Sequence, residues 1–201
     1  MKLPVNEIFY SLQGEGLFTG TPATFIRLAG CNLSCPFCDT NHKNGVPRTV
    51  DYIVGAALRN PSRNVIVTGG EPSLHALAPL VDALHENGFF VQVETNGTNP
   101  LPDTNDFITW SPKDVPVKLS RIDEVKLLFL PRYLDNADDS PELTLQRLLP
   151  QGVEPRRYAL QPCDTGEPYT NSRILEATVD YILRHPQWHL SLQTHKLINI
   201  P

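Results

Sequence analysis

Residues 23–40, ATFIRLAGCNLSCPFCDT, join a predicted β-strand directly to three closely spaced cysteines. Residues 23–29 have the β-branched, aromatic and aliphatic composition that is typical of a strand. Cys31, Cys35 and Cys38 follow it, and no fourth cysteine lies nearby in the sequence. Because a structural metal site usually has four protein ligands, the spacing leaves open what occupies the fourth position.

The rest of the chain alternates strand patterns with helical ones. Further strands are predicted at 64–68, 89–95, 106–110, 124–130, 158–161 and 188–193. Helices are predicted at 50–58, 74–87, 142–149 and 172–184, the second with Ser73 as its N-cap and Gly88 as its end. Such alternation is typical of a mostly parallel sheet covered by helices. A full (β/α)₈ barrel usually needs about 250 residues, so we expect a single α/β domain over residues 1–201, either a shortened, partial TIM-type barrel or an open sheet.

Composition predicts a soluble, cytoplasmic protein with a small-molecule ligand. The chain is 40% hydrophobic, but no apolar run approaches the roughly 20 residues of a membrane-spanning helix, and the first residues lack the apolar segment of a secretory signal. A net charge of −5 without a basic stripe predicts no nucleic-acid partner. Four cysteines, three of them crowded together, favour metal ligation over disulfides in such a chain.

Five polar motifs begin where predicted strands end. They are the cysteine loop, TGGEP at 68–72, TNG at 95–97, SPK at 111–113 and QPCD at 161–164. Because the C-terminal ends of parallel strands meet at one rim, we expect these motifs to form one site there. Within TGGEP, paired glycines allow close approach of the backbone to a ligand, and the carboxylate of Glu71 is a candidate acceptor for an ammonium group.

The three cysteines fit two kinds of metal centre. Thiolates select zinc, copper or iron–sulfur clusters, so the ligand type alone does not identify the metal. The C-x₃-C-x₂-C spacing suits a cubane cluster in which three irons take a cysteine each and the fourth has no protein ligand. The alternative is a zinc site completed by His42 or Cys163, as in a binding module without catalysis. Phe37 before the last cysteine and the rim position favour the cluster.

These motifs resemble the radical S-adenosylmethionine (SAM) enzymes, whose "GGE" segment binds the methionine end of SAM. In that superfamily SAM chelates the open iron, and one electron from the cluster cleaves it to methionine and a 5′-deoxyadenosyl radical. The cofactors supply the difficult chemistry, and the protein supplies binding and orientation. A glycyl-radical-enzyme activase would share this chemistry, but it gives no reason for the segment YSLQGEG at 10–16.

That segment, together with VETNG at 93–97, SPK, LQPCD at 160–164 and QTHKLINIP at 193–201, resembles the 7-carboxy-7-deazaguanine synthases over nearly the whole chain. The resemblance implies a lyase that converts 6-carboxy-5,6,7,8-tetrahydropterin to 7-carboxy-7-deazaguanine with loss of ammonia, in queuosine or other 7-deazapurine biosynthesis. It also implies a [4Fe–4S] cluster, SAM, Mg²⁺, an electron donor such as flavodoxin or ferredoxin, and a homodimer.

The resemblance assigns expected roles residue by residue, without identifying the group that transfers protons. Cys31, Cys35 and Cys38 would hold the cluster, and the Thr40 hydroxyl would bind Mg²⁺, which prefers oxygen ligands. Substrate contacts are expected at Leu12, Gln13, Gly14, Arg27, Thr68 and Pro201. SAM contacts are expected at Phe37, Asp39, Gly70, Ser111, Pro112, Lys113, Gln161, Pro162, Cys163 and Asp164. Further candidates for the pocket are Glu94 and His195.

Two of these residues carry a more detailed expectation. Arg27 interrupts an apolar strand, and a buried arginine needs an anionic partner, which we expect to be Glu15 or the substrate carboxylate. At Pro201, a free α-carboxylate would accept paired hydrogen bonds from the N–H edge of the pterin.

Overall fold

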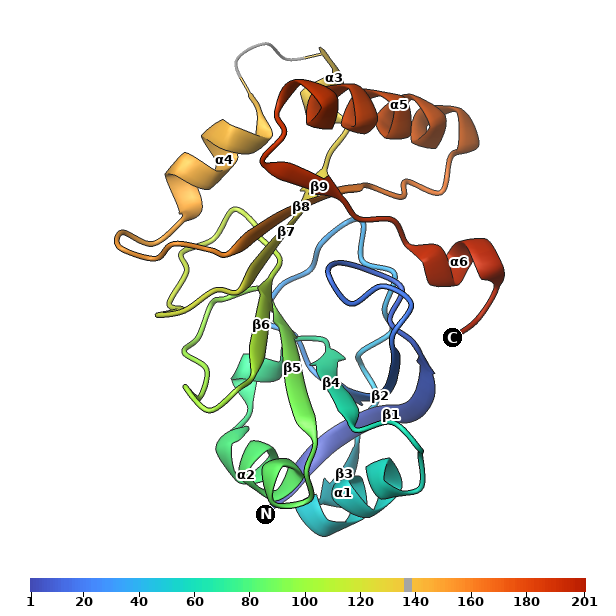
Figure 1. Cartoon of the computed structure of the whole chain (residues 1–201), viewed down its shortest axis with the longest axis vertical. Coiled ribbons are helices and arrows are strands. Elements are labelled where there is room, and N and C mark those ends of the chain that lie inside the picture. The colour runs from blue at the N-terminus through green and yellow to red at the C-terminus, as the bar shows by residue number, and fades with distance from the viewer. Residues whose placement is uncertain (136–138) are drawn as a thin grey trace.

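The computed structural model describes residues 1–135 and 139–201, which form one curved, open sheet with helices on its outside (Figure 1). The strand order is β3-β1-β2-β4-β5-β6-β7-β8-β9. The strands are β1 (Lys2–Leu12), β2 (Pro22–Leu28), β3 (Val46–Thr49), β4 (Asn64–Gly69), β5 (Phe90–Thr95), β6 (Phe107–Trp110), β7 (Glu124–Phe129), β8 (Arg157–Pro162) and β9 (Trp188–Leu190). From β2 through β4 to β9 neighbouring strands are parallel, and only β1 is antiparallel to its neighbours β2 and β3. The predicted partial barrel with a mostly parallel sheet is confirmed.

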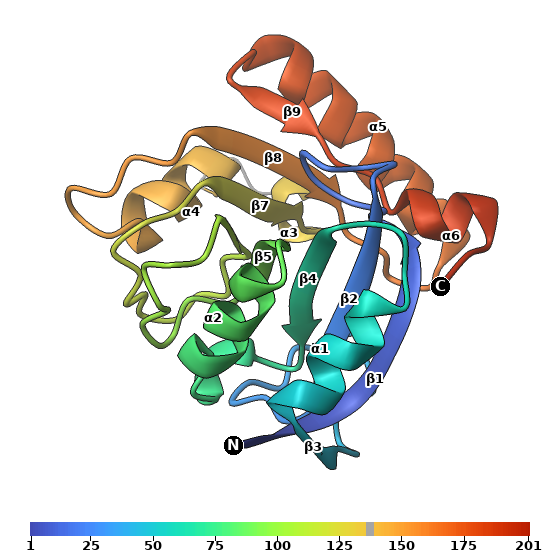
Figure 2. The same cartoon turned by 60° about the horizontal axis from the view of Figure 1, so that its bottom comes forward.

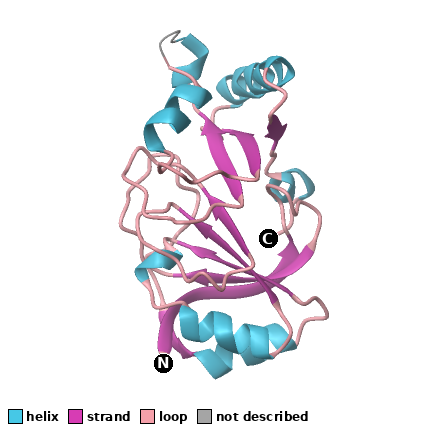
Figure 3. Ribbon diagram, turned by 60° about the vertical axis from the view of Figure 1, so that its left-hand side comes forward, coloured by secondary structure: helices cyan, strands magenta, loops and turns pink. Residues whose placement is uncertain are grey.

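Helices cover the convex face in two groups, one toward each end of the sheet (Figure 3). They are α1 (Val50–Leu58), α2 (Ala78–Glu86), α3 (Arg132–Asp135), α4 (Pro141–Leu148) and α5 (Pro168–Arg184), with a 3₁₀ turn η1 (Pro72–Leu74). The last helix, α6 (Thr194–Ile198), lies instead beside the concave interior. Figure 2 shows α1 and α2 next to each other over β1, β2 and β4. Their apolar faces join a core built around Ile26, Val67 and Leu84, and α4 and α5 join a second core around Trp110 and Leu160. None of the helices in the described ranges has the length and apolar character needed to cross a membrane.

The start of α2 differs from the prediction. The helix begins at Ala78 and its N-cap, Leu77, makes no side-chain capping bond. Ser73 lies instead in η1, where its N–H donates to the carboxylate of Glu71 at 2.9 Å. The acidic side chain thus caps this turn, and serine does not serve as a cap. The helix ends at Glu86 with Asn87 as its C-cap, and the predicted stop residue Gly88 follows with φ of +74°.

The segment between β1 and β2 turns into the concave interior of the sheet (Figure 1). Its base is closed by hydrogen bonds from Gln13 N–H to Thr21 O and from Gly20 N–H to Gln13 O. At its tip, the ring of Phe18 lies 5.8 Å from Phe90 and 4.9 Å from Phe107, which are the first residues of β5 and β6. We name residues 13–21 the inner loop. It closes the interior at the N-terminal ends of the parallel strands.

Candidate functional site

A cavity of about 810 Å³ occupies the concave side of the sheet. Its wall takes residues from the inner loop, from the cysteine loop after β2, from the C-terminal ends of β4, β5 and β6, and from β7, β8 and α6. The predicted rim therefore forms one part of the site, and the inner loop and α6 supply parts that come from elsewhere in the fold.

The structure brings most of the predicted site residues together. The cavity is lined by Cys31, Cys35, Cys38, Thr40, Leu12, Gln13, Gly14, Arg27, Thr68, Pro201, Phe37, Asp39, Gly70, Ser111, Lys113, Gln161, Glu94 and His195. Four predicted SAM contacts are not part of its wall: Pro112, Pro162, Cys163 and Asp164. Their role stays a prediction, and for Cys163 the structure shows a buried side chain.

The cysteine loop presents three free thiols to the cavity. Burial raises the pKa of the Cys35 thiol; Lys113 opposes this effect, and the neighbouring thiols Cys31 and Cys38 add to it. No three His, Cys, Asp or Glu side chains in the described ranges are grouped so that they could hold one metal ion. A four-iron cluster does not require such a group, because each cysteine binds a different iron. The three thiols line one cavity, as a cluster that takes one cysteine for each of three irons would require.

The glycines of TGGEP pack against the backbone that leads into the first cysteine. A Cβ on Gly70 would lie 1.9 Å from the carbonyl oxygen of Gly30, and a Cβ on Gly69 would lie 2.1 Å from that of Leu28. The adjacent N–H of Glu71 donates to the same Gly30 oxygen at 2.8 Å. This contact fixes the end of β4 against the cysteine loop, and only glycine permits it.

Glu71 ties two of the predicted motifs together. The residue is 1% exposed. Besides the bond from Ser73, its carboxylate accepts from Thr95 Oγ1 and from Asn96 N–H, both at 2.6 Å. Protein donors thus occupy both oxygens, which makes Glu71 a buried link between TGGEP and TNG.

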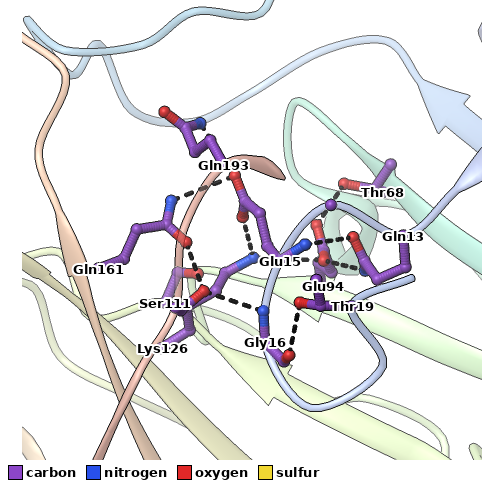
Figure 4. Close-up of polar contacts among 12 residues, drawn as sticks. Gln13, Glu15, Gly16, Thr19, Thr68, Glu94, Ser111, Lys126, Gln161 and Gln193 are labelled. Carbon is purple, nitrogen blue, oxygen red and sulfur yellow. Dashed lines mark hydrogen bonds and ion pairs between the residues drawn. The ribbon is translucent and has the colours of Figure 1, made fainter. Parts of the chain in front are cut away.

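A network of charged and amide side chains lies deeper in the cavity, beside the inner loop (Figure 4). The ammonium group of Lys126 on β7 contacts the carboxylates of Glu15 and Glu94 at 2.5 and 3.3 Å. Amides and hydroxyls complete the network: Gln13 and Thr68 donate to Glu94, and Gln161 and Gln193 donate to Glu15. These contacts join the inner loop to four strands and to the segment before α6.

The charges in this network fix the ionisation of its members. Burial alone would raise the pKa of Glu15, but the charge and hydrogen bond of Lys126, with a hydrogen bond from Gln193, outweigh it and hold that pKa at about 2. Burial alone would lower the pKa of Lys126, but Glu15 and Glu94 outweigh it and raise that pKa above its ordinary value. At neutral pH Glu15 is a carboxylate and Lys126 is an ammonium group.

Arg27 has a different anionic partner from the one predicted. Its Nε donates to Glu7 Oε1 at 2.6 Å, and its Nη1 donates to Thr40 Oγ1 at 3.3 Å. The expected pairing with Glu15 is wrong because Glu7 lies directly opposite Arg27 in the antiparallel β1–β2 register. The guanidinium still borders the cavity, with the side chain 23% exposed.

The C-terminal segment closes against both parts of the site. Thr194 donates through its N–H and its hydroxyl to Gly14 O, and the hydroxyl of Ser11 donates to Pro201 O at 2.8 Å. Lys196 on α6 contacts Asp39 of the cysteine loop at 3.1 Å and Asp164 after β8 at 3.0 Å. Asp164 therefore lies beside the site although it is not in the cavity wall.

Sequence reasoning missed Lys126, Gln193 and Lys196. Lys126 had a detectable signal, since it interrupts the apolar strand EVKLLFL as Arg27 interrupts FIRLA. Gln193 and Lys196 lie in a segment that was predicted to begin as a strand, whereas β9 ends at Leu190 and α6 begins at Thr194.

Comparison with known proteins identifies a matching family model, similar full-length relatives and a similar solved structure. Residues 25–109 match the model of the Radical SAM superfamily. The chain is 48% identical over 201 residues to the 7-carboxy-7-deazaguanine synthase of Bacteroides thetaiotaomicron, with all of both chains covered. It is 35% identical over 233 residues to that of Escherichia coli K12, again with full coverage of both. The crystal structure of QueE from Escherichia coli matches with a TM-score of 0.75 and 32% identity, covering 96% of this chain and 94% of that one.

Proposed function

The chain belongs to the 7-carboxy-7-deazaguanine synthase family of radical SAM enzymes, and from this premise we propose that it converts 6-carboxy-5,6,7,8-tetrahydropterin to 7-carboxy-7-deazaguanine with loss of ammonia. The observation that carries the proposal is the division of one cavity into two parts. Three free thiols at exposed or partly exposed positions line it, and so does the less exposed network of Lys126, Glu15 and Glu94. A radical enzyme that acts on a polar bicyclic substrate needs its cluster site and its substrate site in one cavity, because the radical must reach the substrate.

The radical SAM family implies a [4Fe–4S] cluster and SAM, and when bound these supply the radical that starts the reaction. We propose that Cys31, Cys35 and Cys38 hold the cluster. SAM would lie along the strand ends that surround it, against the residues Phe37, Asp39, Gly70, Ser111, Lys113 and Gln161. The chain's own task is to hold both groups beside the substrate and to keep water out.

The cavity wall formed by β2 and β4 supports the proposed substrate contacts. A guanidinium has five N–H donors, and Glu7 and Thr40 take two of those of Arg27. Its remaining donors are available to a substrate carboxylate, which is the planar anion that arginine binds best. Gln13, Thr68 and Glu94 offer polar groups for the heterocycle on the same wall.

The remaining features belong to the proposal and rest on the family resemblance. Mg²⁺ would be held by the hydroxyl of Thr40, a residue that lines the cavity, with waters and substrate oxygens completing its shell. We also propose an electron donor such as flavodoxin or ferredoxin, a homodimer, and a single catalytic domain over residues 1–201. The cytoplasmic location predicted from the sequence stays a prediction.

The decisive experiment is anaerobic incubation of reconstituted protein with SAM, reductant, Mg²⁺ and carboxytetrahydropterin. We expect mass detection of 7-carboxy-7-deazaguanine that depends on both SAM and reductant. A colourless protein that binds zinc and forms no product would support the binding-module alternative. SAM cleavage without deazaguanine, but with radical formation on an added protein, would support the activase alternative.

A further inference from the structure

A lysine occupies the interior of the sheet, where an ammonium group is costly. Lys126 lies in β7 between Val125 and Leu127, which are both buried in the core. Its own side chain is 7% exposed. Removing a charge from water carries a large desolvation penalty unless partners replace the lost solvation. The two carboxylates of Glu15 and Glu94 are those partners.

The two carboxylates are not equivalent. Glu15 accepts from Gln161 and Gln193 at one oxygen and from Lys126 at the other, so three protein donors hold it. Its side chain is 15% exposed. Lys126 and Gln161 lie on the neighbouring strands β7 and β8 and Gln193 directly precedes α6, so Glu15 acts as an anchor for Lys126.

Glu94 also accepts three hydrogen bonds, but its Oε2 accepts only from a neutral hydroxyl, whereas Oε2 of Glu15 accepts from the ammonium group of Lys126. In Glu94, Oε1 accepts from Gln13 and from Lys126, and Oε2 accepts from Thr68 alone, at 3.2 Å. Each carboxylate oxygen can accept about two hydrogen bonds, so Oε2 keeps one free acceptor position in both residues, and in Glu94 this position lies beside a hydroxyl group and not beside an ammonium group. Both residues line the cavity, and Glu94 is the more exposed of the two, at 22% against 15%.

We propose that Lys126, anchored by Glu15, is a positioning residue that fixes Glu94 so that its free acceptor position receives an N–H group of the substrate. The inference rests on the proposed function, because the pterin is the source of that N–H. Two carboxylates and one ammonium leave one net negative charge at this wall, which favours a hydrogen-bond donor over an acceptor. Lys126 itself remains charged, so it does not serve as a base.

A purely structural role for Lys126 predicts a different effect on substrate binding when Lys126 and Glu15 are replaced together. If Lys126 only neutralised Glu15, then removing both charges would restore the fold and the substrate site together. If Lys126 positions Glu94, removing both charges would restore the fold but leave Glu94 without its orienting partner. The variants Lys126→Met and Lys126→Met/Glu15→Gln separate these two roles.

The experiment measures three quantities on each reconstituted variant under anaerobic conditions: the thermal midpoint, the Kd of SAM and the Kd of carboxytetrahydropterin. For Lys126→Met we expect a lower midpoint, because two partly buried carboxylates then lose the cation between them. For the double variant we expect most of the midpoint to return, with SAM affinity near that of the wild type. Pterin binding should be about 10-fold to 100-fold weaker in both, the usual effect of losing a hydrogen bond to a charged group. Lys2→Met, at an exposed lysine of β1, is the control for lysine removal.

A further variant, Glu94→Gln, tests the inference without a large effect on folding. Glu94→Gln retains the size of the side chain and leaves the Lys126–Glu15 pair in place, so its midpoint and SAM affinity should stay near those of the wild type while pterin binding weakens to the same extent. Wild-type pterin affinity in Glu94→Gln, or in a folded double variant, would overturn the inference. Failure of the unmodified protein to bind or convert the pterin would overturn the proposed function instead.

Discussion

Replacing Gly70 by alanine tests whether close packing of backbone on backbone positions the cysteine loop. The new Cβ would lie 1.9 Å from Gly30 O and 3.1 Å from Cys31 N, whereas ordinary contacts begin near 3.4 Å. Gly70 does not have a positive φ, so alanine would be destabilising there through steric overlap and not through an unfavourable backbone conformation. Both neighbours are backbone atoms, and no side chain can rotate away to relieve the clash.

The expected cost of Gly70→Ala is at the upper end of the range for overpacking, about 3 kcal/mol. In a chain of this size, 1 kcal/mol corresponds to about 2–4 °C, so the thermal midpoint should fall by about 6–12 °C. The displaced backbone carries Cys31, so iron and sulfide content after reconstitution should fall as well. Both quantities are measurable on the same preparation.

Gly55→Ala is the matched control. Gly55 lies inside α1, has open space where an added methyl group would lie, and needs no positive φ. Alanine in a helix interior is favoured over glycine by roughly 0.5–1 kcal/mol, so the midpoint should rise slightly with no change in iron content. If Gly70→Ala had the midpoint and iron content of the wild type, the close contact between β4 and the cysteine loop would not be the feature that holds the loop.

Three shorter predictions concern the ion pairs and thiols. The pKa of Glu15 lies at about 2, below its ordinary value of 4.5, so its stabilising effect is complete above about pH 4.5 and is lost as the pH falls toward 2. Glu15→Gln should therefore lose less stability in acid than the wild type, by about 3 kcal/mol, in denaturant titrations at pH 5 and pH 2. Lys196→Met should change stability by less than about 1 kcal/mol, because its partners are partly exposed, but should weaken pterin binding about fivefold by releasing α6. Cys31→Ser should abolish the visible absorption of the reconstituted cluster, whereas Cys163→Ser should retain it.

Local sequence patterns predicted the strands and the rim motifs well, because both depend on short-range composition. Helix α1 begins and ends as predicted, and β5 and β6 differ from prediction by one residue at their start. The cysteine loop, TGGEP, TNG and SPK each follow a predicted strand, and parallel pairing then brings them to one side of the sheet.

Charge pairing across the sheet could not be predicted in the same way. The sequence shows that Arg27 and Lys126 interrupt apolar strands and therefore need anionic partners. It does not show that β1 runs antiparallel to β2 with Glu7 opposite Arg27. Nor does it show that the inner loop turns inward and brings Glu15 to Lys126, which is 111 residues away in the chain. Strand register and loop direction are properties of the folded chain, and they determine which carboxylate pairs with Arg27 and which with Lys126.

The inner loop and α6 together explain how an open sheet can enclose a reactive intermediate. A closed barrel excludes water with its own strands, but this sheet leaves one side open. The inner loop fills the N-terminal opening with Phe18 packed between Phe90 and Phe107. Segment 193–201 closes the open side by bonding to Gly14 and, through Lys196, to the loops that carry Asp39 and Asp164.

This arrangement has a consequence for the order of events at the site. The same segment contacts the inner loop, where the substrate is proposed to bind, and the cysteine loop, where SAM is proposed to bind. Closing an active site removes water that would otherwise quench a reactive species. One segment thus connects the two proposed binding regions. We therefore expect SAM cleavage to be faster with the pterin bound than without it, and equal rates in single-turnover measurements would show that α6 does not connect the two parts.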